Sequence, residues 1–445
     1  MAVSNLRFLL LTSSAVGLSA IAAAPSSLKY SDLHDFGGIV RNASNASLRD
    51  GGPPGAAVIF DSVGNMYGTT AGGGLYGYGN IWKLTPAGKY TDIHDFGGKV
   101  KRANGNMGPD GTGGGSVLID KNGNLYGCAG TGGYYGRDGS SSSSMGFGIL
   151  WKLTQKGTYT DIHDFGNIAE TTAGTFVADG VGPSGLAIDA NGNLFGAAGF
   201  GGLYNRGMAF QLSSNGTYTD VHDFGGLTTY IGTKPIYDGI QPLGVVLDSS
   251  GNLFGVTWVG GLYGGPGGPQ GIVWEITASG KYQNLHDFGG MVSSVGGSTT
   301  RDGGDPEGTP SLDKGGNLYG TTPGTVWKLS TTGTYSLLYE FTNQNDGIDA
   351  HGGVIVDSNG NLFGTTSSGG LNGKGVVFEL SSTGVYKDLH DFGGYTKFGA
   401  VKKLNPSYPQ TGLTFDHAGH IYGSTSQGGA NVSPISDGGS LFILK

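Results

Sequence analysis

The chain has 445 residues, of which 91 are glycine and 16 are proline, and only 13% are charged. Its 25 basic and 33 acidic residues give a net charge of −8, so no Lys/Arg-rich stripe can neutralise phosphates, which argues against a nucleic-acid partner. The single cysteine cannot form an intramolecular disulfide. This length suits two or three ordinary domains, or one large domain built from repeats.

The first 22 residues predict a secretory signal peptide. Arg7 precedes an apolar run that begins at Phe8, and Ala20-Ile21-Ala22 provides an A-x-A cleavage site. A short membrane anchor is the alternative, and no later stretch approaches the ~20 apolar residues that span a bilayer. We therefore expect a secreted or periplasmic protein that has no membrane contact after signal cleavage. Residues 23–445 would form its single domain.

Three short phrases recur along the whole chain, seven times each. The first resembles "GNLYG" and stands at 64–68, 123–127, 192–196, 251–255, 316–320, 360–364 and 419–423. The second resembles "WKL" and stands at 81–84, 150–153, 209–212, 273–276, 326–329, 377–380 and 441–444. The third resembles "YTDIHDFGG" and ends at Gly38, Gly98, Asn167, Gly226, Gly290, Asn343 and Gly394. Repeats of this kind indicate stacked structural units.

Each repeat contains four β-rich runs, which in the second repeat are "GSVLID", "NLYGCA", "GILWKL" and "TYTDIHDF". Period-2 alternation and Asn-Gly turns predict antiparallel strands joined by hairpins. Four strands repeated seven times predict an all-β protein, a seven-bladed β-propeller. The chain begins with an unpaired fourth strand (28–36) and ends with an unpaired third strand (440–445). Pairing these two would close the ring without a free sheet edge.

The recurring His-Asp pair indicates a scaffold role rather than chemistry. Six copies carry the histidine, and one copy carries Tyr339-Glu340 instead. A side chain present in every blade is most simply a polar tie between blades, or between a strand and a loop. The Asp-x-Asn-Gly-Asn turns, such as 120–124, lack the glycine position and the later bidentate Glu of a calcium loop. We expect no metal ion and no cofactor.

The combination of "GNLYGTT", "WKLTPAG" and "YTDIHDFGG" resembles the GloVer-type (choice-of-anchor) tandem-repeat family of exported bacterial proteins. The resemblance covers roughly residues 28 to 445. It implies export and a propeller-like repeat architecture. Because the family's motif residues are the repeated scaffold, the resemblance implies no single reaction and no catalytic residue.

Function is expected where the repeat symmetry is broken. Within a blade the a–b and c–d turns are short, so the long b–c and d–a loops share the opposite face, where binding sites concentrate. Polar residues in the d–a loops of two neighbouring blades, predicted to lie at the mouth of the central channel, are Asp305, Glu307, Asp349 and His351. Capping of the loops by these side chains is the alternative explanation.

The b–c loops contribute aromatic and basic candidates. Arg137, Arg206 and Lys374 follow a Gly-Gly pair at the same spacing, and basic groups there could bind carboxylates. Tyr204 and Tyr263 also follow such a pair, and Trp258 is the one tryptophan outside the "WKL"-type strands. These aromatic rings suit sugar faces, although packing is the alternative for each.

The favoured hypothesis is a glycan-directed protein that binds an extracellular polysaccharide. In one form of this hypothesis the protein also cleaves the polysaccharide, as a lyase or as a glycoside hydrolase. A lyase would use Arg137 or Arg206 to neutralise a uronate, with His351 or Tyr339 as the base. A glycoside hydrolase would use two carboxylates from Asp305, Glu307 and Asp349. The alternative is a non-catalytic surface or matrix module that binds proteins. In each case we expect a monomer.

Overall fold

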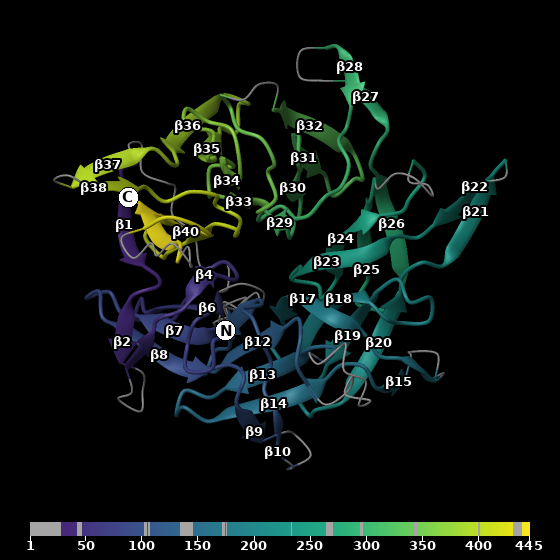
Figure 1. The fold of residues 1–445 in the computed structure, drawn as a ribbon. Coiled ribbons are helices and arrows are strands. Elements are labelled where there is room, and N and C mark those ends of the chain that lie inside the picture. The colour runs from purple at the N-terminus through teal and green to yellow at the C-terminus, as the bar shows by residue number, and fades with distance from the viewer. Residues whose placement is uncertain are drawn as a thin grey trace, which may run out of the picture.

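The computed structural model describes residues 28–41, 47–101, 105, 107–133, 146–170, 174, 176–232, 234–263, 270–293, 297–341, 345–398, 401–429 and 438–445. These residues form seven antiparallel sheets arranged in a ring, a seven-bladed β-propeller (Figure 1). The predicted all-β class and the number of blades are confirmed. The predicted signal peptide, residues 1–22, lies outside the described residues. Within the described part of the chain, no helix is long and apolar enough to cross a membrane.

The blades are numbered in chain order, and their strands run from a, nearest the axis, to d at the outside. Blade 1 consists of β5 (Ile59–Phe60), β6 (Met66–Gly72), β7 (Asn80–Leu84) and β8 (Tyr90–Asp95), with β4 (Gly52–Pro54) added to β6. Blade 2 consists of β11 (Val117–Ile119), β12 (Leu125–Ala129), β13 (Ile149–Leu153) and β14 (Tyr159–Asp164). Blade 3 consists of β17 (Val181–Ile188), β18 (Leu194–Phe200), β19 (Met208–Leu212) and β20 (Tyr218–Asp223).

The remaining blades follow the same order. Blade 4 consists of β23 (Ile240–Leu247), β24 (Leu253–Val259), β25 (Ile272–Ile276) and β26 (Tyr282–Asp287). Blade 5 consists of β29 (Ser311–Leu312), β30 (Leu318–Thr322), β31 (Thr325–Leu329) and β32 (Tyr335–Glu340). Blade 6 consists of β33 (Val354–Val356), β34 (Leu362–Thr366), β35 (Val376–Leu380) and β36 (Tyr386–Asp391). Blade 7 consists of β39 (Thr414–Phe415), β40 (Ile421–Thr425), β41 (Ser440–Leu444) and β1 (Tyr30–Asp35).

The two ends of the chain close the ring in blade 7, as the sequence predicts. Strand β1 pairs antiparallel with β41, and Tyr30 lies opposite Leu444. Just beyond the strands, the Lys29 N–H donates to the Lys445 carbonyl (2.8 Å) and the Lys445 N–H donates to the Lys29 carbonyl (3.1 Å). This pairing satisfies the backbone groups that an open sheet edge would expose.

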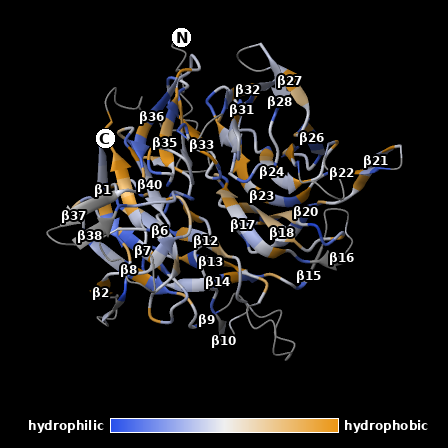
Figure 2. Ribbon diagram, turned by 45° about the horizontal axis from the view of Figure 1, so that its top comes forward, coloured by the Kyte–Doolittle hydropathy of each residue, from blue (hydrophilic) through white to orange (hydrophobic). Residues whose placement is uncertain are grey.

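The "GNLYG" and "WKL" phrases recur together because they pack on each other. A Cβ added to Gly68 in β6 would lie 2.3 Å from the ring of Trp82 in β7, and one added to Gly196 in β18 would lie 2.4 Å from Phe210. Trp82 and Phe210 are both completely buried. The glycine therefore leaves room for the aromatic ring of the next strand, which packs in an apolar cluster. Figure 2 shows hydrophobic residues, in orange, along the strands of the blades.

Six two-stranded ribbons project from the periphery of the ring (Figure 1), which the sequence analysis does not predict. Each ribbon follows a d strand. They are β2 (Ile39–Arg41) with β3 (Ser47–Arg49), β9 (Lys99–Lys101) with β10 (Met107–Pro109), β15 (Ile168–Glu170) with β16 (Phe176–Ala178), β21 (Leu227–Ile231) with β22 (Lys234–Tyr237), β27 (Met291–Ser293) with β28 (Thr299–Arg301), and β37 (Tyr395–Phe398) with β38 (Val401–Leu404). Among the described residues, only the d strand of blade 5 has no ribbon after it.

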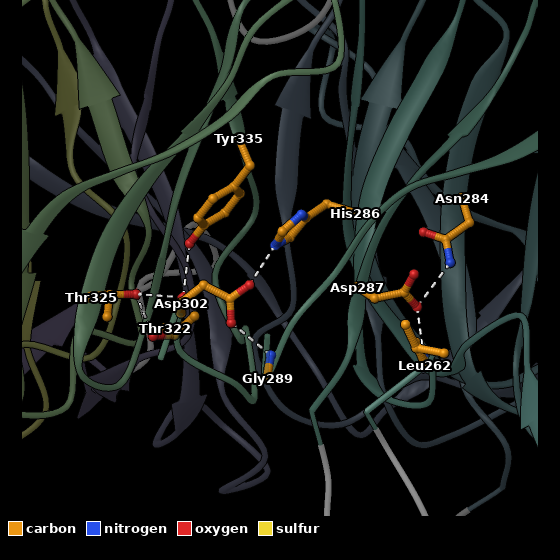
Figure 3. Close-up of polar contacts among 9 residues, drawn as sticks. All are labelled: Leu262, Asn284, His286, Asp287, Gly289, Asp302, Thr322, Thr325 and Tyr335. Carbon is orange, nitrogen blue, oxygen red and sulfur yellow. Dashed lines mark hydrogen bonds and ion pairs between the residues drawn. The ribbon is translucent and has the colours of Figure 1, made fainter. Parts of the chain in front are cut away.

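The histidine of the third phrase fastens each blade to the next, as Figure 3 shows for blades 4 and 5. His286 Nε2 lies 2.9 Å from Oδ2 of Asp302, which stands at the far end of the ribbon, and Asp302 Oδ1 accepts the N–H of Gly289. Tyr335, in the d strand of the next blade, donates its hydroxyl to the Asp302 carbonyl (2.8 Å). Its ring stacks on His286 with the ring centroids 3.9 Å apart.

The same contact recurs around the ring. The other His–Asp pairs are His34–Asp50 (2.8 Å), His94–Asp110 (2.7 Å), His163–Asp179 (2.9 Å) and His222–Asp238 (3.1 Å). Blade 5 uses Tyr339, whose hydroxyl donates to Asp346 (3.0 Å). His390 stacks on Tyr30 across the closure of the ring (3.6 Å). These contacts bear out the scaffold interpretation of the repeated pair.

Candidate functional site

The segments that lead into the a strands of six blades hold an uncommon backbone conformation on the loop-rich face. Three residues after the "DG"-type loop aspartate, φ is positive in Gly113, Gly182, Gln241, Asp305, Asp349 and, where Asn405 replaces the aspartate, Tyr408. Blade 1 differs, because Pro53 occupies this position. The φ values of the non-glycine members are 56°, 59°, 63° and 58° in that order. Side chains are rare in this region of φ, and such residues cluster at functional sites.

Each of these residues is held by the b–c loop of the preceding blade. The N–H of Gln241 donates to the carbonyl of Arg206 (2.8 Å), that of Asp305 to Gln270 (3.2 Å), and that of Asp349 to Pro323 (3.1 Å). The contact fixes where the d–a loop crosses from one blade to the next. It therefore places the side chains that follow on the inner part of the loop-rich face.

Blades 5 and 6 bring together two predicted site residues, Glu307 and His351. His351 Nδ1 lies 2.5 Å from Glu307 Oε2, and both side chains are about one-third exposed. The backbones approach closely beside this contact, since a Cβ on Gly308 would lie 2.4 Å from the nitrogen of Gly353. This contact therefore bridges the chain segments that lead into the a strands of two neighbouring blades, β29 and β33.

Asp305 stands two residues before Glu307. Its Oδ1 atom is buried and has no hydrogen-bond partner among the described residues. Partial burial, and secondly the charge of Glu307, raise the pKa of the Asp305 carboxyl. A raised pKa is the direction of shift that an acid catalyst requires.

Asp349 belongs to the same stretch of chain as His351, and the His351 N–H donates to its carbonyl (3.1 Å). Its carboxylate, however, accepts a hydrogen bond from the hydroxyl of Ser368 in blade 6 (2.9 Å). The structure thus places Asp349 beside the Glu307–His351 pair and gives it a partner of its own.

The b–c connections differ in length between blades. That of blade 5 is only Pro323-Gly324, whereas residues 260–271 connect the equivalent strands of blade 4. Asp349 contacts this short turn, because its N–H donates to the Pro323 carbonyl. The Asp305, Glu307, Asp349 and His351 group therefore lies beside the shortest b–c connection of the ring.

Trp258 lies on the same face, at the end of β24. The register places Ile240 opposite Val259 and Pro242 opposite Thr257, so Gln241 and Trp258 face each other between these pairs. Trp258 is 38% exposed, in a strand whose preceding five residues are buried. An aromatic ring beside an amide is therefore open to solvent one blade away from the polar group.

The basic candidates have their own contacts. The Arg206 guanidinium lies over the ring of Tyr237, 4.2 Å from the centroid, and its stem packs where a Cβ of Gly225 would stand. The Lys374 ammonium lies over the ring of Tyr408 (4.4 Å) and donates to its hydroxyl. Cation–π contacts of this kind engage Arg206, one of the two residues predicted to neutralise a uronate, and Lys374, which was predicted to bind substrate.

Arg137 lies outside the described residues. Phe147 occupies the position in blade 2 that Arg206 occupies in blade 3. The Phe147 carbonyl accepts the N–H of Gly182, and the Arg206 carbonyl accepts the N–H of Gln241 in the same way. The b–c loop of blade 2 is longer than that of blade 3, so equal spacing from the Gly-Gly pair does not give an equivalent position.

The tyrosine candidates serve the scaffold. A Cβ on Gly226 would lie 3.5 Å from the Tyr204 ring, and one on Gly290 would lie 3.1 Å from the Tyr263 ring. Both rings cover the glycine turn after strand d and remain about half exposed. Tyr339 stands apart from the polar group, because it stacks on Tyr386 as part of the contact between blades.

Burial and the nearby Asp346 raise the pKa of the Tyr339 hydroxyl, which opposes the predicted role as a base.

The polar group of Asp305, Glu307, Asp349 and His351 is not arranged to bind a metal ion. In the described part of the chain, no set of three or more His, Cys, Asp or Glu side chains is arranged to hold a metal ion.

A comparison with protein families finds a match in the second half of the chain. A family model described as the Gloeobacter/Verrucomicrobia repeat matches residues 236–442. These residues are therefore similar to that repeat. The match supports the resemblance seen in the phrases, and it covers blades 4 to 6 together with β39, β40 and the start of β41 in blade 7. A comparison with curated proteins gives no match.

Some solved structures are similar to this chain at low identity. A proposed gluconolactonase is 12% identical, with 98% of this chain and 97% of that chain covered and a TM-score of 0.41. The extracellular domain of a proposed one-component system from B. thetaiotaomicron is 13% identical, with 95% of this chain and 42% of that chain covered and a TM-score of 0.49. A gluconolactonase from Xanthomonas campestris is 15% identical, with 66% and 78% covered and a TM-score of 0.36. These similarities carry no argument about activity.

The structure adds four residues that the sequence analysis did not select: Gln241, Gln270, Ser368 and Tyr408. A signal for Gln241 and Tyr408 was present, since both stand three residues after the loop aspartate or its asparagine substitute. Gln270 and Ser368 carry no such signal, because their position depends on the path of a b–c loop.

Proposed function

We propose that the protein is an exported glycan-binding propeller, and that a polysaccharide chain lies across the loop-rich face at blades 5 and 6. One observation carries the proposal: the polar group of Asp305, Glu307, Asp349 and His351 stands beside the two-residue b–c turn of blade 5, the shortest b–c connection of the ring. A long polymer needs a site that is open at the side, and sugar hydroxyls need a few fixed polar groups. The exposed ring of Trp258 provides an apolar surface on the same face.

The test is affinity electrophoresis of the purified mature chain through gels that contain neutral, amino-sugar or uronic-acid polysaccharides. Retention by at least one polymer is expected. Glu307→Gln should weaken it about tenfold, because loss of a charged hydrogen-bond partner costs ~1.5–3 kcal/mol. Glu379→Gln is the matched control, since Glu379 also contacts a basic side chain in blade 6, that of Lys387 at 3.9 Å. If no polymer retains the protein, the glycan proposal is wrong and the protein-interaction module becomes the better hypothesis.

A second candidate is hydrolysis of the bound polymer, which the raised pKa of Asp305 beside Glu307 favours. In this version Asp305 donates a proton to the glycosidic oxygen, and Glu307 activates water or attacks the sugar. Reducing ends should appear without the absorbance of unsaturated products, and Asp305→Asn should abolish them while retention persists. Retention without new reducing ends would leave a binding protein. Unsaturated products would instead indicate a lyase, a reaction for which Arg206 and Tyr339 are already engaged elsewhere.

A further inference from the structure

A second repeated feature of the d strands concerns carboxyl groups that meet in the interior. Asp92 and Asp220 stand two residues before the histidines of blades 1 and 3, and each is only 1% exposed. The Asp92 carboxyl is in hydrogen-bond contact with that of Asp95, and the Asp220 carboxyl with that of Asp223. Two carboxylates cannot form such a contact unless one of them carries a proton.

The surroundings supply few other donors. Asp92 accepts from the amide of Asn80 (3.0 Å), but its Oδ1 atom is buried without a hydrogen-bond partner. In blade 3 the residue at the position of Asn80 is Met208, and Asp220 Oδ2 is likewise buried without one. The remaining donor is the backbone N–H of the following histidine in each blade.

Blade 4 shows what the shared proton would do. Asn284 stands at the position of Asp92, and its amide donates a hydrogen bond to Asp287 Oδ1 (3.1 Å), as Figure 3 shows. An amide N–H and a protonated carboxyl are both donors to a carboxylate. Asn284 thus donates this hydrogen bond at any pH, whereas Asp92 and Asp220 can donate one only while they are protonated.

The second carboxylate of each pair holds a loop of the ligand-facing side. Asp95 Oδ1 accepts the N–H of Leu75 (2.6 Å), and Asp223 Oδ1 accepts that of Leu203 (2.7 Å). In blade 4, Asp287 accepts the N–H of Leu262 in the same way (2.7 Å). These leucines lie at the start of the b–c loop tips. A change in the charge of a buried pair can therefore change how firmly its aspartate holds the b–c loop.

We propose that Asp92–Asp95 and Asp220–Asp223 each share one proton, and that its loss releases the b–c loops of blades 1 and 3 from their d strands. The inference does not depend on the identity of the ligand. Loss of the proton leaves two negative charges in contact in a site from which water is largely excluded, and the pair separates.

The pKa of each pair depends on its burial and on the groups that face it. Burial is the largest cause, and the charge of the second aspartate adds to it. Together they raise the pKa of Asp92 to about 7 and that of Asp220 to about 8. Asp179 also raises the pKa of Asp220, whereas Asn80 lowers that of Asp92. Because these pKa values lie above the ordinary value, the stability that the pairs contribute is full at low pH and is lost as pH rises through the raised pKa.

A hollow borders the pair in blade 1. It has a volume of about 280 Å³, and Asp92 and Asp95 line it together with His94, Lys99 and Asp110. The hollow gives protons a route to Asp92. In blade 6 the corresponding Asp388 is exposed, and the pKa rises only to about 6, as expected if burial is the main cause.

Hydrogen exchange of the whole mature chain tests the proposal, with protection factors corrected for the intrinsic effect of pH. Between pH 5.5 and pH 9, protection at Leu75 and Leu203 should fall at least about tenfold, with midpoints between about 7 and about 8. Protection at Leu262 should not change, because Asn284 does not titrate. Local protection is measured rather than global stability, because His390 affects global stability in the opposite way. Burial lowers the pKa of His390 to about 4, so this residue destabilises the fold as pH falls, whereas the aspartate pairs do so as pH rises.

Reciprocal substitutions complete the test. Asp92→Asn with Asp220→Asn should abolish the pH dependence at Leu75 and Leu203, and Asn284→Asp should create it at Leu262. An equal change at all three leucines in the natural chain would overturn the proposal, as would persistence in the asparagine variant. If a variant does not fold, infrared spectra of the natural chain decide: a carboxylic-acid band must persist above pH 6 and disappear by pH 9, and its absence at pH 6 would refute the shared proton.

Discussion

At the scale of single residues, each position of the repeated "YTDIHDFGG" phrase has its own contact. In the copy around His94, the tyrosine receives the stacked ring of the preceding blade, the histidine reaches the next loop aspartate, and Asp95 holds its own b–c loop. Phe96 is completely buried, and the two glycines lie beneath the rings of Tyr78 and Tyr76. These contacts explain why the tyrosine, the histidine, the second aspartate, the phenylalanine and the glycines recur in the phrase.

The glycine of the "GNLYG" phrase gives a residue-scale prediction within one strand, β18. Gly196→Ala should lower the free energy of unfolding by about 2 kcal/mol, because its Cβ would meet Phe210 at 2.4 Å in a packed interior. Gly199→Ala should change it by less than about 0.5 kcal/mol, because no atom lies within 4 Å of the added Cβ. Denaturant unfolding monitored by tryptophan fluorescence measures both. Equal effects would show that backbone conformation, rather than the contact with Phe210, decides the cost.

At the scale of elements, the propeller is held by links between neighbouring blades as well as by pairing within each sheet. The d strand of one blade, the ribbon that follows it and the d strand of the next meet at a single loop aspartate, such as Asp302. Asp302 is 1% exposed, so these hydrogen bonds offset the cost of burying its carboxyl group. Blade 5 keeps the link without a ribbon, through Tyr339 and Asp346.

Removing the histidine of a link should therefore destabilise the ring. His286→Ala should lower the free energy of unfolding by about 2–3 kcal/mol, since it leaves the buried Asp302 without its ring partner. His420→Ala is the control, because His420 also contacts an aspartate at 2.8 Å but lies in a partly exposed turn; its effect should stay below about 1 kcal/mol. Thermal unfolding of both variants gives the comparison, and a larger effect for His420→Ala would contradict the link.

At the scale of the whole molecule, the seventh blade is an ordinary blade whose c–d turn has been cut. Lys445 and Lys29 exchange two backbone hydrogen bonds, and in blade 1 the Thr85 N–H donates likewise to the Lys89 carbonyl across the turn 86–88. The ends of the chain therefore face each other at a hairpin position. The ring is closed by sheet pairing and by the stacking of His390 on Tyr30.

A circular permutant tests this closure. Joining Lys445 to Lys29 through Pro-Ala-Gly, copied from 86–88, and opening the chain between Ser279 and Gly280 should give a monomer with the same cooperative unfolding. Deleting residues up to Phe36 should instead give an insoluble or aggregating chain, because β41 would lose its partner and a buried ring would be missing. A soluble deletion variant with unchanged unfolding would show that the ring does not need its closing strand.

The sequence by itself determined the blade count, the approximate strand positions and the closure of the ring. These follow from local periodicity and turn residues, which repeat with every blade. It also pointed to Glu307 and His351, because departures from a repeat are visible in the repeat. Only the tertiary structure decided that these two side chains meet, that Phe147 rather than Arg137 occupies the position equivalent to Arg206, and that Tyr339 belongs to the scaffold. Those facts depend on loops of unequal length and on contacts between blades, and spacing along the chain encodes neither.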